Sequence, residues 1–122
     1  MKTILVADDD KNIRELLEIE LSLQGYQVVL ANNGLEALTK IKYRPPDILI
    51  LDIKMPDING LEVLEALRKE NKKFPIIICS AYEKMQDDYT VWASRIAGFI
   101  TKPIDPDKLE AIIEKSLADK AA

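Results

Sequence analysis

The stretch Asp47-Ile48-Leu49-Ile50-Leu51-Asp52 places four consecutive large aliphatic residues between two acidic ones. A short apolar run without polar alternation is typical of a strand that is covered on both faces. Other short apolar runs lie on either side of it in the chain. The full set of predicted strands is Thr3 to Ala7, Val28 to Ala31, Ile48 to Leu51, Ile76 to Cys79 and Phe99 to Thr101.

Stretches with apolar residues at helical spacing separate these runs. The first spans Ile13 to Leu21 and stops at Gly25, which suits a C-terminal cap. The last starts with Asp105 as the N-cap and Pro106 at the first helical position. The other three predicted helices run from Gly34 to before Pro45, around Leu61, Leu64 and Leu67, and from Lys84 to Ala93.

Strand and helix therefore alternate five times along the chain. This order predicts an α/β fold, with a five-stranded parallel sheet, right-handed crossovers and helices on both faces. A length of 122 residues fits one domain, so we interpret residues 1–122 as a single domain without an output domain.

Composition narrows the class of protein. Hydrophobic residues make up 48% and charged residues 31%, and the net charge of −4 argues against nucleic acid as a direct target. The one basic cluster, from Arg68 to Lys73, is expected at a helix C-terminus, where cations are favourable. A lone cysteine, Cys79, fits a small buried hydrophobe. We find neither a signal peptide nor an apolar stretch of about 20 residues, and we expect a cytoplasmic protein without membrane insertion.

Polar side chains follow four of the five predicted strands. Sites in open parallel sheets form at the carboxyl ends of the strands, where the strand order reverses. Three acidic residues, Asp8, Asp9 and Asp10, follow the first strand, and the third, fourth and fifth strands lead to Asp52, Ser80 and Lys102. We therefore expect these residues to meet at one rim of the sheet.

Carboxylates brought together repel one another unless a cation offsets their charge. Oxygen ligands without Cys or His suit a hard cation such as Mg2+, with Mn2+ or Ca2+ as substitutes. The chain contains no histidine, which excludes catalysis by a histidine base within it. With Lys102 and Ser80 as donors, the rim favours a Mg2+-dependent phosphoryl site. Any one acid can instead be a helix N-cap, and Asp10 is expected to be one.

These residues carry a resemblance to a known family. The segment Ile4-Leu5-Val6-Ala7-Asp8-Asp9-Asp10 is similar to the acidic start of bacterial two-component response-regulator receiver domains. Their phosphoacceptor loop resembles Leu51-Asp52-Ile53-Lys54-Met55-Pro56 with Gly60, and Ser80-Ala81 and Lys102-Pro103 match in order. The chain thus resembles a stand-alone receiver of the chemotaxis or sporulation type. This implies a flavodoxin-like, doubly wound (βα)5 fold with strand order 2-1-3-4-5.

The resemblance also implies a role for each position. Asp52 is expected to accept the phosphoryl group, and Mg2+ to bind Asp9, Asp52, the backbone carbonyl of Lys54 and, mainly through water, Asp8. Lys102 is expected to contact the acyl phosphate, and the peptide bond from Lys102 to Pro103 is expected to be cis. Ser80 and Phe99 are the expected switch pair, which alters the surface of helix 4, strand 5 and helix 5. Lys54 and Tyr82 are expected to tune how easily water reaches the phosphoryl group.

Such a domain is a phosphoacceptor that promotes its own modification, not an enzyme acting on other substrates. The implied partners are a histidine kinase or a histidine phosphotransfer domain, with a small acyl phosphate as another donor, and an unknown downstream protein. One alternative is a Mg2+-dependent phosphatase of the haloacid-dehalogenase type, because Asp8-Asp9-Asp10 contains Asp-x-Asp. A flavin-binding module needs a phosphate loop after the first strand, whereas this loop is acidic.

In the fourth helix, we expect Met85, Tyr89 and Trp92 to pack on the sheet.

Overall fold

The structure, a computed structural model, describes residues 1–81 and 95–121 of the chain. Five parallel strands form one sheet in the order β2-β1-β3-β4-β5, as predicted. Two strands continue one residue beyond their predicted ends, so that Asp52 and Ser80 are themselves the last residues of strands. The strands are β1 (Thr3–Ala7), β2 (Gln27–Ala31), β3 (Ile48–Asp52), β4 (Ile76–Ser80) and β5 (Gly98–Thr101).

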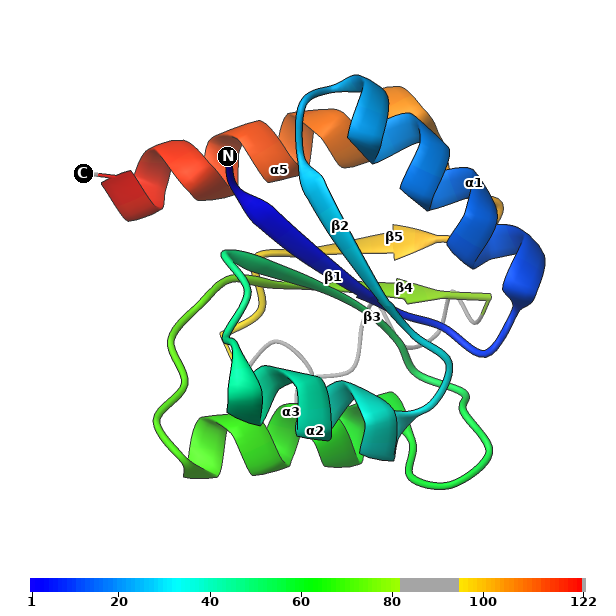
Figure 1. The fold of residues 1–122 in the computed structure, drawn as a ribbon, viewed down its shortest axis with the longest axis vertical. Coiled ribbons are helices and arrows are strands. Elements are labelled where there is room, and N and C mark those ends of the chain that lie inside the picture. Colours follow the sequence, from blue (N-terminus) through cyan, green and yellow to red (C-terminus); the bar gives the residue numbers. More distant parts are fainter. Residues whose placement is uncertain (82–94, 122) are drawn as a thin grey trace.

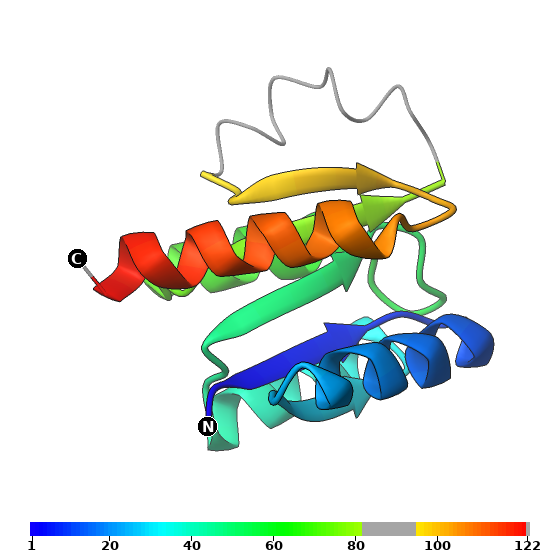
Figure 2. The same ribbon diagram turned by 90° about the horizontal axis from the view of Figure 1, so that it is seen from above.

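Helices cover both faces of the sheet. In Figures 1 and 2, α1 and α5 lie on one face, while α2 and α3 lie on the other. The predicted helix from Lys84 to Ala93 lies outside the described residues, as do Tyr82, Met85, Tyr89 and Trp92. The helices that the structure describes are α1 (Lys11–Leu23), α2 (Gly34–Tyr43), α3 (Gly60–Lys69) and α5 (Pro106–Ala121).

The central strands divide their side chains between two hydrophobic clusters. Because side chains alternate across a strand, Ile48 and Ile50 of β3 pack toward α1 and α5, whereas Leu49 and Leu51 pack toward α2 and α3. All five residues of β3 and of β4 are buried. Cys79 belongs to the cluster beside α1 and α5, which confirms it as a small buried hydrophobe.

Each of the four described helices starts at a residue whose side chain accepts hydrogen bonds from the first turn, and for α2 this residue is Asn33. Asp10 accepts from the backbone N–H of Asn12, which confirms its predicted N-cap role. Asp105 accepts from the N–H groups of Asp107 and Lys108. Asn59 and Glu62 form a reciprocal capping box at the start of α3, which satisfies backbone N–H groups at this helix end.

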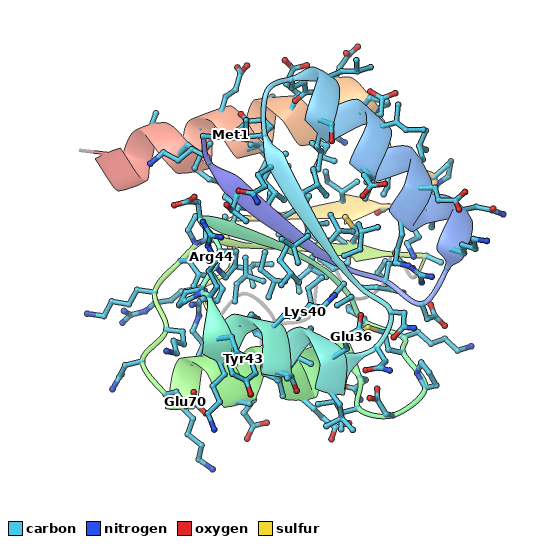
Figure 3. All side chains as sticks on the ribbon, viewed as in Figure 1. Met1, Glu36, Lys40, Tyr43, Arg44 and Glu70 are labelled. Atoms are coloured by element: carbon cyan, nitrogen blue, oxygen red, sulfur yellow. The ribbon has the colours of Figure 1, made fainter. Side chains whose placement is uncertain are left out.

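Local contacts order the exposed side of α2. Figure 3 shows Lys40 and Glu36 one turn apart on this helix, and their charged groups lie 3.5 Å from each other. The Lys40 ammonium also donates to the carbonyl of Leu30, which ties α2 to β2. Tyr43 at the helix end is 85% exposed. No helix in the described ranges has the length and apolar character needed to cross a membrane.

Candidate functional site

The strand register brings the predicted acidic residues to one rim. Ala7 of β1 lies opposite Leu51 of β3, so the next residues of the two strands, Asp8 and Asp52, emerge at the same level. Asp52 in turn pairs with Cys79 of β4, one residue before Ser80. Ser80 lies opposite Thr101 of β5, and the backbone N–H of Lys102 donates to the Ser80 carbonyl at 2.8 Å.

Three carboxylates converge at this rim. One oxygen each of Asp8, Asp9 and Asp52 can be chosen so that all three lie within 4.8 Å of one another. Asp8 and Asp52 are 2% and 5% exposed, whereas Asp9 is exposed to solvent. Asp8 is held in place by the backbone N–H of Asp10, which donates to its Oδ1 at 2.9 Å. Carboxylates as deeply buried as those of Asp8 and Asp52 need cationic partners to remain charged.

Lys102 is the cationic partner that the structure supplies. Its Nζ lies 2.9 Å from Asp8 Oδ2 and 3.4 Å from Asp52 Oδ2. Burial by itself lowers the pKa of Lys102, but the hydrogen bond and charge of Asp8, together with Asp52, outweigh it and raise the pKa. The ammonium therefore stays charged and aimed between two carboxylates.

One lysine does not fully compensate the cluster. Burial, followed by the charge of Asp8, raises the pKa of Asp52 to about 6, although Lys102 acts in the opposite direction. A second cation would remove this repulsion, and the donor set consists only of oxygens, which a hard divalent cation prefers. The residues present therefore fit a Mg2+ site, with Asp9 as its solvent-facing carboxylate.

The loop that follows Asp52 is fixed at both ends. Gly60 opens α3 directly beneath the strand end, where an added Cβ would lie closer than 3.0 Å to the Asp52 carbonyl oxygen. The Gly60 N–H donates to the Ile53 carbonyl at 2.6 Å. Asp57 accepts from the N–H groups of Gly34 and Leu35, each at 3.1 Å, which ties the loop to the first turn of α2.

The structure describes most of the remaining predicted residues. Ser80 is 1% exposed at the end of β4, and Phe99 is 8% exposed in the hydrophobic cluster beside α2 and α3. The side chain of Lys54 is exposed on the loop after Asp52. The peptide bond between Lys102 and Pro103 is cis, as expected. Of the two predicted tuning residues, Tyr82 lies outside the described residues.

Two supports of the site were not predicted from the sequence. Arg14 of α1 donates to the backbone carbonyl of Asp8 at 2.8 Å, which anchors the acidic loop to the helix that follows it. Asp57 holds α2, although the chain separates it from Gly34 by 23 residues. The spacing of Asn59 and Glu62 could have predicted their capping box, but no pattern in the chain pairs Asp57 with Gly34.

Comparison with known sequences places this arrangement in a family. The family model described as the response regulator receiver domain matches residues 4–114. The probable transcriptional regulator ycf27 of Cyanophora paradoxa is 40% identical over 95% of this chain and 48% of its own length. The regulatory protein AtoC of Escherichia coli is 32% identical over 93% of this chain and 25% of its own length. The chain thus spans between a quarter and a half of these curated relatives.

Solved structures agree with this assignment. The response regulator protein TrrA of Thermotoga maritima, in complex with Mg2+-BeF, is 44% identical with a TM-score of 0.88, covering 96% of this chain and 100% of that one. A CheY-like receiver domain protein of Methanospirillum hungatei is 29% identical with a TM-score of 0.93, covering 99% and 97%. The fold and the family model therefore lead to the same conclusion.

Proposed function

Because the chain belongs to the response regulator receiver domain family, we propose that it accepts a phosphoryl group on Asp52 and reports this change to a partner protein. The observation that carries the proposal is the position of Asp52. It is buried at the end of β3, beside Asp8, Asp9 and the ammonium of Lys102. A carboxylate in this setting is a nucleophile that a metal and a lysine can hold in its ionised form.

The transfer step places each residue in a definite role. An Asp52 carboxylate oxygen attacks the phosphorus of a phosphohistidine or a small acyl phosphate. The new oxygen–phosphorus bond forms as the bond to the donor breaks, and the leaving group takes the electron pair. Lys102 supplies positive charge to the phosphoryl oxygens, and the Ser80 hydroxyl donates a hydrogen bond to one of them.

Mg2+ is the proposed cofactor, held by Asp9, Asp52 and the Lys54 carbonyl, with Asp8 acting through bound water. When bound, it neutralises the negative charge that phosphoryl transfer concentrates at the rim. TrrA, which is 44% identical to this chain, was solved in complex with Mg2+-BeF, and this supports the choice of metal. Mn2+ and Ca2+ are the substitutes we propose, because they take the same oxygen ligands.

The proposed switch links Ser80 to Phe99. Movement of the Ser80 hydroxyl toward the phosphoryl group changes the space available beside β5, and the Phe99 ring responds by shifting its packing. Phe99 carries no hydroxyl, so its buried position leaves no polar atom without a partner. The output surface would then be that of the segment before β5, β5 itself and α5.

A histidine kinase or a histidine phosphotransfer domain is the proposed donor, and the cytoplasm is the proposed location of this chain. The chain contains no histidine, so the phosphohistidine belongs to another polypeptide segment. As a phosphoacceptor switch, the domain would promote its own phosphorylation and dephosphorylation without turning over a separate substrate. The phosphatase alternative finds no support, because the family model that matches residues 4–114 is that of receiver domains.

Mass spectrometry after incubation with acetyl phosphate and Mg2+ tests the proposal. We expect one added phosphoryl group in the wild-type chain and none in Asp52→Asn. Asp57→Asn is the matched control, because it removes one charge from the same loop and leaves Asp52 in place. Labelling of Asp52→Asn at the wild-type level, or labelling that continues in excess EDTA, would overturn the proposal.

A further inference from the structure

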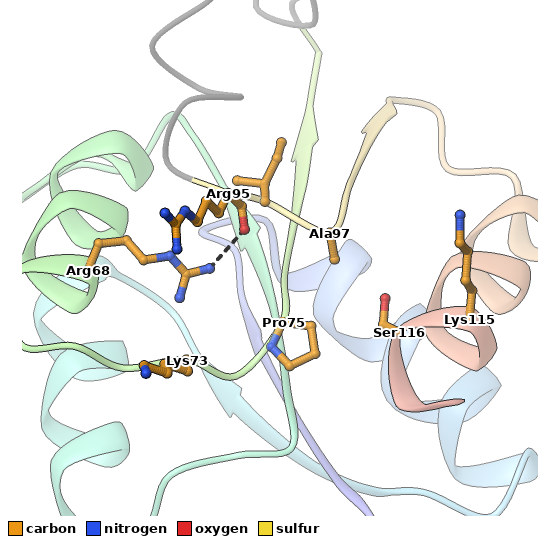
Figure 4. Close-up of a pocket in the computed structure, with 8 residues that line it drawn as sticks. Arg68, Lys73, Pro75, Arg95, Ala97, Lys115 and Ser116 are labelled. Atoms are coloured by element: carbon orange, nitrogen blue, oxygen red, sulfur yellow. Dashed lines mark hydrogen bonds between the residues drawn. The ribbon is translucent and has the colours of Figure 1, made fainter. Parts of the chain in front are cut away.

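A polar hollow lies at the end of the sheet opposite to the acidic rim. Its volume is about 460 Å3, and its floor comes from Pro75, just before β4, and Ala97, just before β5. Because the strands are parallel, this is the amino end of the sheet, away from Asp52. Figure 4 shows Arg68, Lys73 and Arg95 on one side of the hollow, with Lys115 and Ser116 of α5 on the other.

Four cationic side chains surround this hollow, which we call the basic pocket: Arg68, Lys73, Arg95 and Lys115. No acidic residue is among its described lining residues. Within residues 1–81 and 95–118, none of the ion pairs includes Lys73, Arg95 or Lys115. The chain as a whole carries a net charge of −4, so a concentration of positive charge here is not a consequence of composition.

The two arginines are held close together despite their like charges. Arg68 donates through one terminal nitrogen to the carbonyls of Lys72 and Phe74, and through the other to the carbonyl of Arg95 at 3.2 Å. These bonds fix the half-buried side chain of Arg68 across the end of α3. They also hold the backbone of Arg95, whose φ is 60° and whose exposed side chain is among those that line the hollow.

From this geometry we infer that the basic pocket binds a small phosphorylated molecule. Guanidinium groups form paired hydrogen bonds with phosphate oxygens, and lysines add point charges without a geometric demand. The volume falls in the range of small-molecule sites and exceeds the space that a single phosphate occupies. Pro75, Ile96 and Ala97 offer a partly apolar wall for the remainder of a nucleotide-sized ligand.

This site is separate from phosphoryl acceptance. It uses no residue of the acidic rim, and binding needs no Mg2+ because the pocket supplies cations of its own. Ligand binding here is therefore independent of whether Asp52 is the phosphoacceptor. It also gives a second role to the Arg68–Lys73 cluster, which the sequence alone assigned only to complementing a helix C-terminus.

Calorimetric titration in EDTA tests the inference with ATP, ADP and inorganic phosphate as probes. EDTA keeps divalent metal from the acidic rim, so that this rim repels the same probes. The test variant is Arg95→Asn/Lys115→Gln, in which Asn tolerates the positive φ of position 95. Its matched control is Lys69→Gln/Lys108→Gln, which removes the same charge from α3 and α5 outside the pocket.

We expect ATP or ADP to bind the wild-type chain and the control equally, and the test variant at least about tenfold more weakly. Amide resonances of Ala97 and Ser116 should shift on binding, while those of Asp8 and Asp52 stay in place. If inorganic phosphate bound as tightly as ATP or ADP, the ligand would be a simple phosphate and not a nucleotide-sized molecule. Equal losses in both double variants, no saturable binding, or tighter binding of an acidic peptide or of DNA would overturn the inference.

Discussion

The two ends of the sheet collect charge of opposite sign and hold it differently. At the carboxyl ends, Asp8 and Asp52 are buried and share one lysine. At the amino ends, the guanidinium of Arg95 is exposed, and the half-buried Arg68 is satisfied by backbone carbonyls. Electrostatic strain is therefore concentrated at the acidic end, because its charges are desolvated and one lysine does not fully compensate them.

Gly60→Ala should damage the acidic end most. The new Cβ would lie closer than 3.0 Å to the Asp52 carbonyl oxygen, and a strand backbone cannot yield as a flexible side chain does. We expect a loss of about 3 kcal/mol or more in the free energy of unfolding, measured by urea denaturation. Gly25→Ala is the control: its φ of 94° disfavours Ala, but nothing lies within 4 Å, so about 1–2 kcal/mol is expected. Equal losses would refute the close-approach argument.

Asp52→Asn should relieve the strain of the acidic end without metal. The pKa of Asp52 rises from 3.8 to about 6 on folding, so the folded state holds its proton more tightly than the unfolded chain. Stability from this group therefore falls as the pH rises from about 4 to about 6 and stays low above that range. A shift of this size corresponds to a gain of up to about 3 kcal/mol for Asp52→Asn at pH 7.

Urea unfolding in EDTA at several pH values measures this gain. The variant should show its advantage at pH 7 and lose it near pH 4, while Mg2+ should stabilise the wild-type chain much more than the variant. A variant less stable than the wild-type chain at pH 7 in EDTA would mean that Lys102 already compensates both carboxylates.

The acidic end was predictable from sequence in a way that the basic end was not. Asp8, Asp52, Ser80 and Lys102 each follow a short apolar run, and parallel strands must deliver such residues to one rim. Arg68 contacts Arg95, which lies 27 residues further along the chain, only because the end of α3 meets the residues just before β5. No periodicity encodes that meeting. The close approach of Gly60 to β3 depends likewise on tertiary packing, although Gly60 was noted as part of a motif.

Arg68→Gln, at the basic end, should lower the free energy of unfolding by less than Gly60→Ala does at the acidic end. Burial, and then the charge of Arg95, lowers the pKa of Arg68, yet its guanidinium still donates to three carbonyls. Losing these bonds should cost about 2 kcal/mol in the free energy of unfolding. Lys69→Gln removes the same charge from the neighbouring exposed position and should change stability little. If both variants lost the same free energy of unfolding, the effect of Arg68→Gln would come from losing charge at the helix end and not from losing these hydrogen bonds.

Asp57→Ala should give the smallest effect and sharpen the contrast with Asp52. Burial acts to raise the pKa of Asp57, but hydrogen bonds from the N–H groups of Ile58, Leu35 and Gly34 outweigh it and lower the pKa. The carboxylates of Asp52, at the end of β3, and of Asp57, in the loop that follows, thus contribute to stability with opposite pH dependence. The tether formed by Asp57 is present at neutral pH and is lost only as the pH falls below about 4.

Because this tether fixes the loop that carries Lys54, we expect Asp57→Ala to weaken Mg2+ binding by less than about tenfold. The measurement is Mg2+ titration followed by the fluorescence of the one tryptophan at pH 7. Asp57→Asn keeps an acceptor oxygen and should recover part of the affinity. An Asn variant as weak as the Ala variant would show that the loop needs the charge of Asp57 at the start of α2, and not its hydrogen bonds alone.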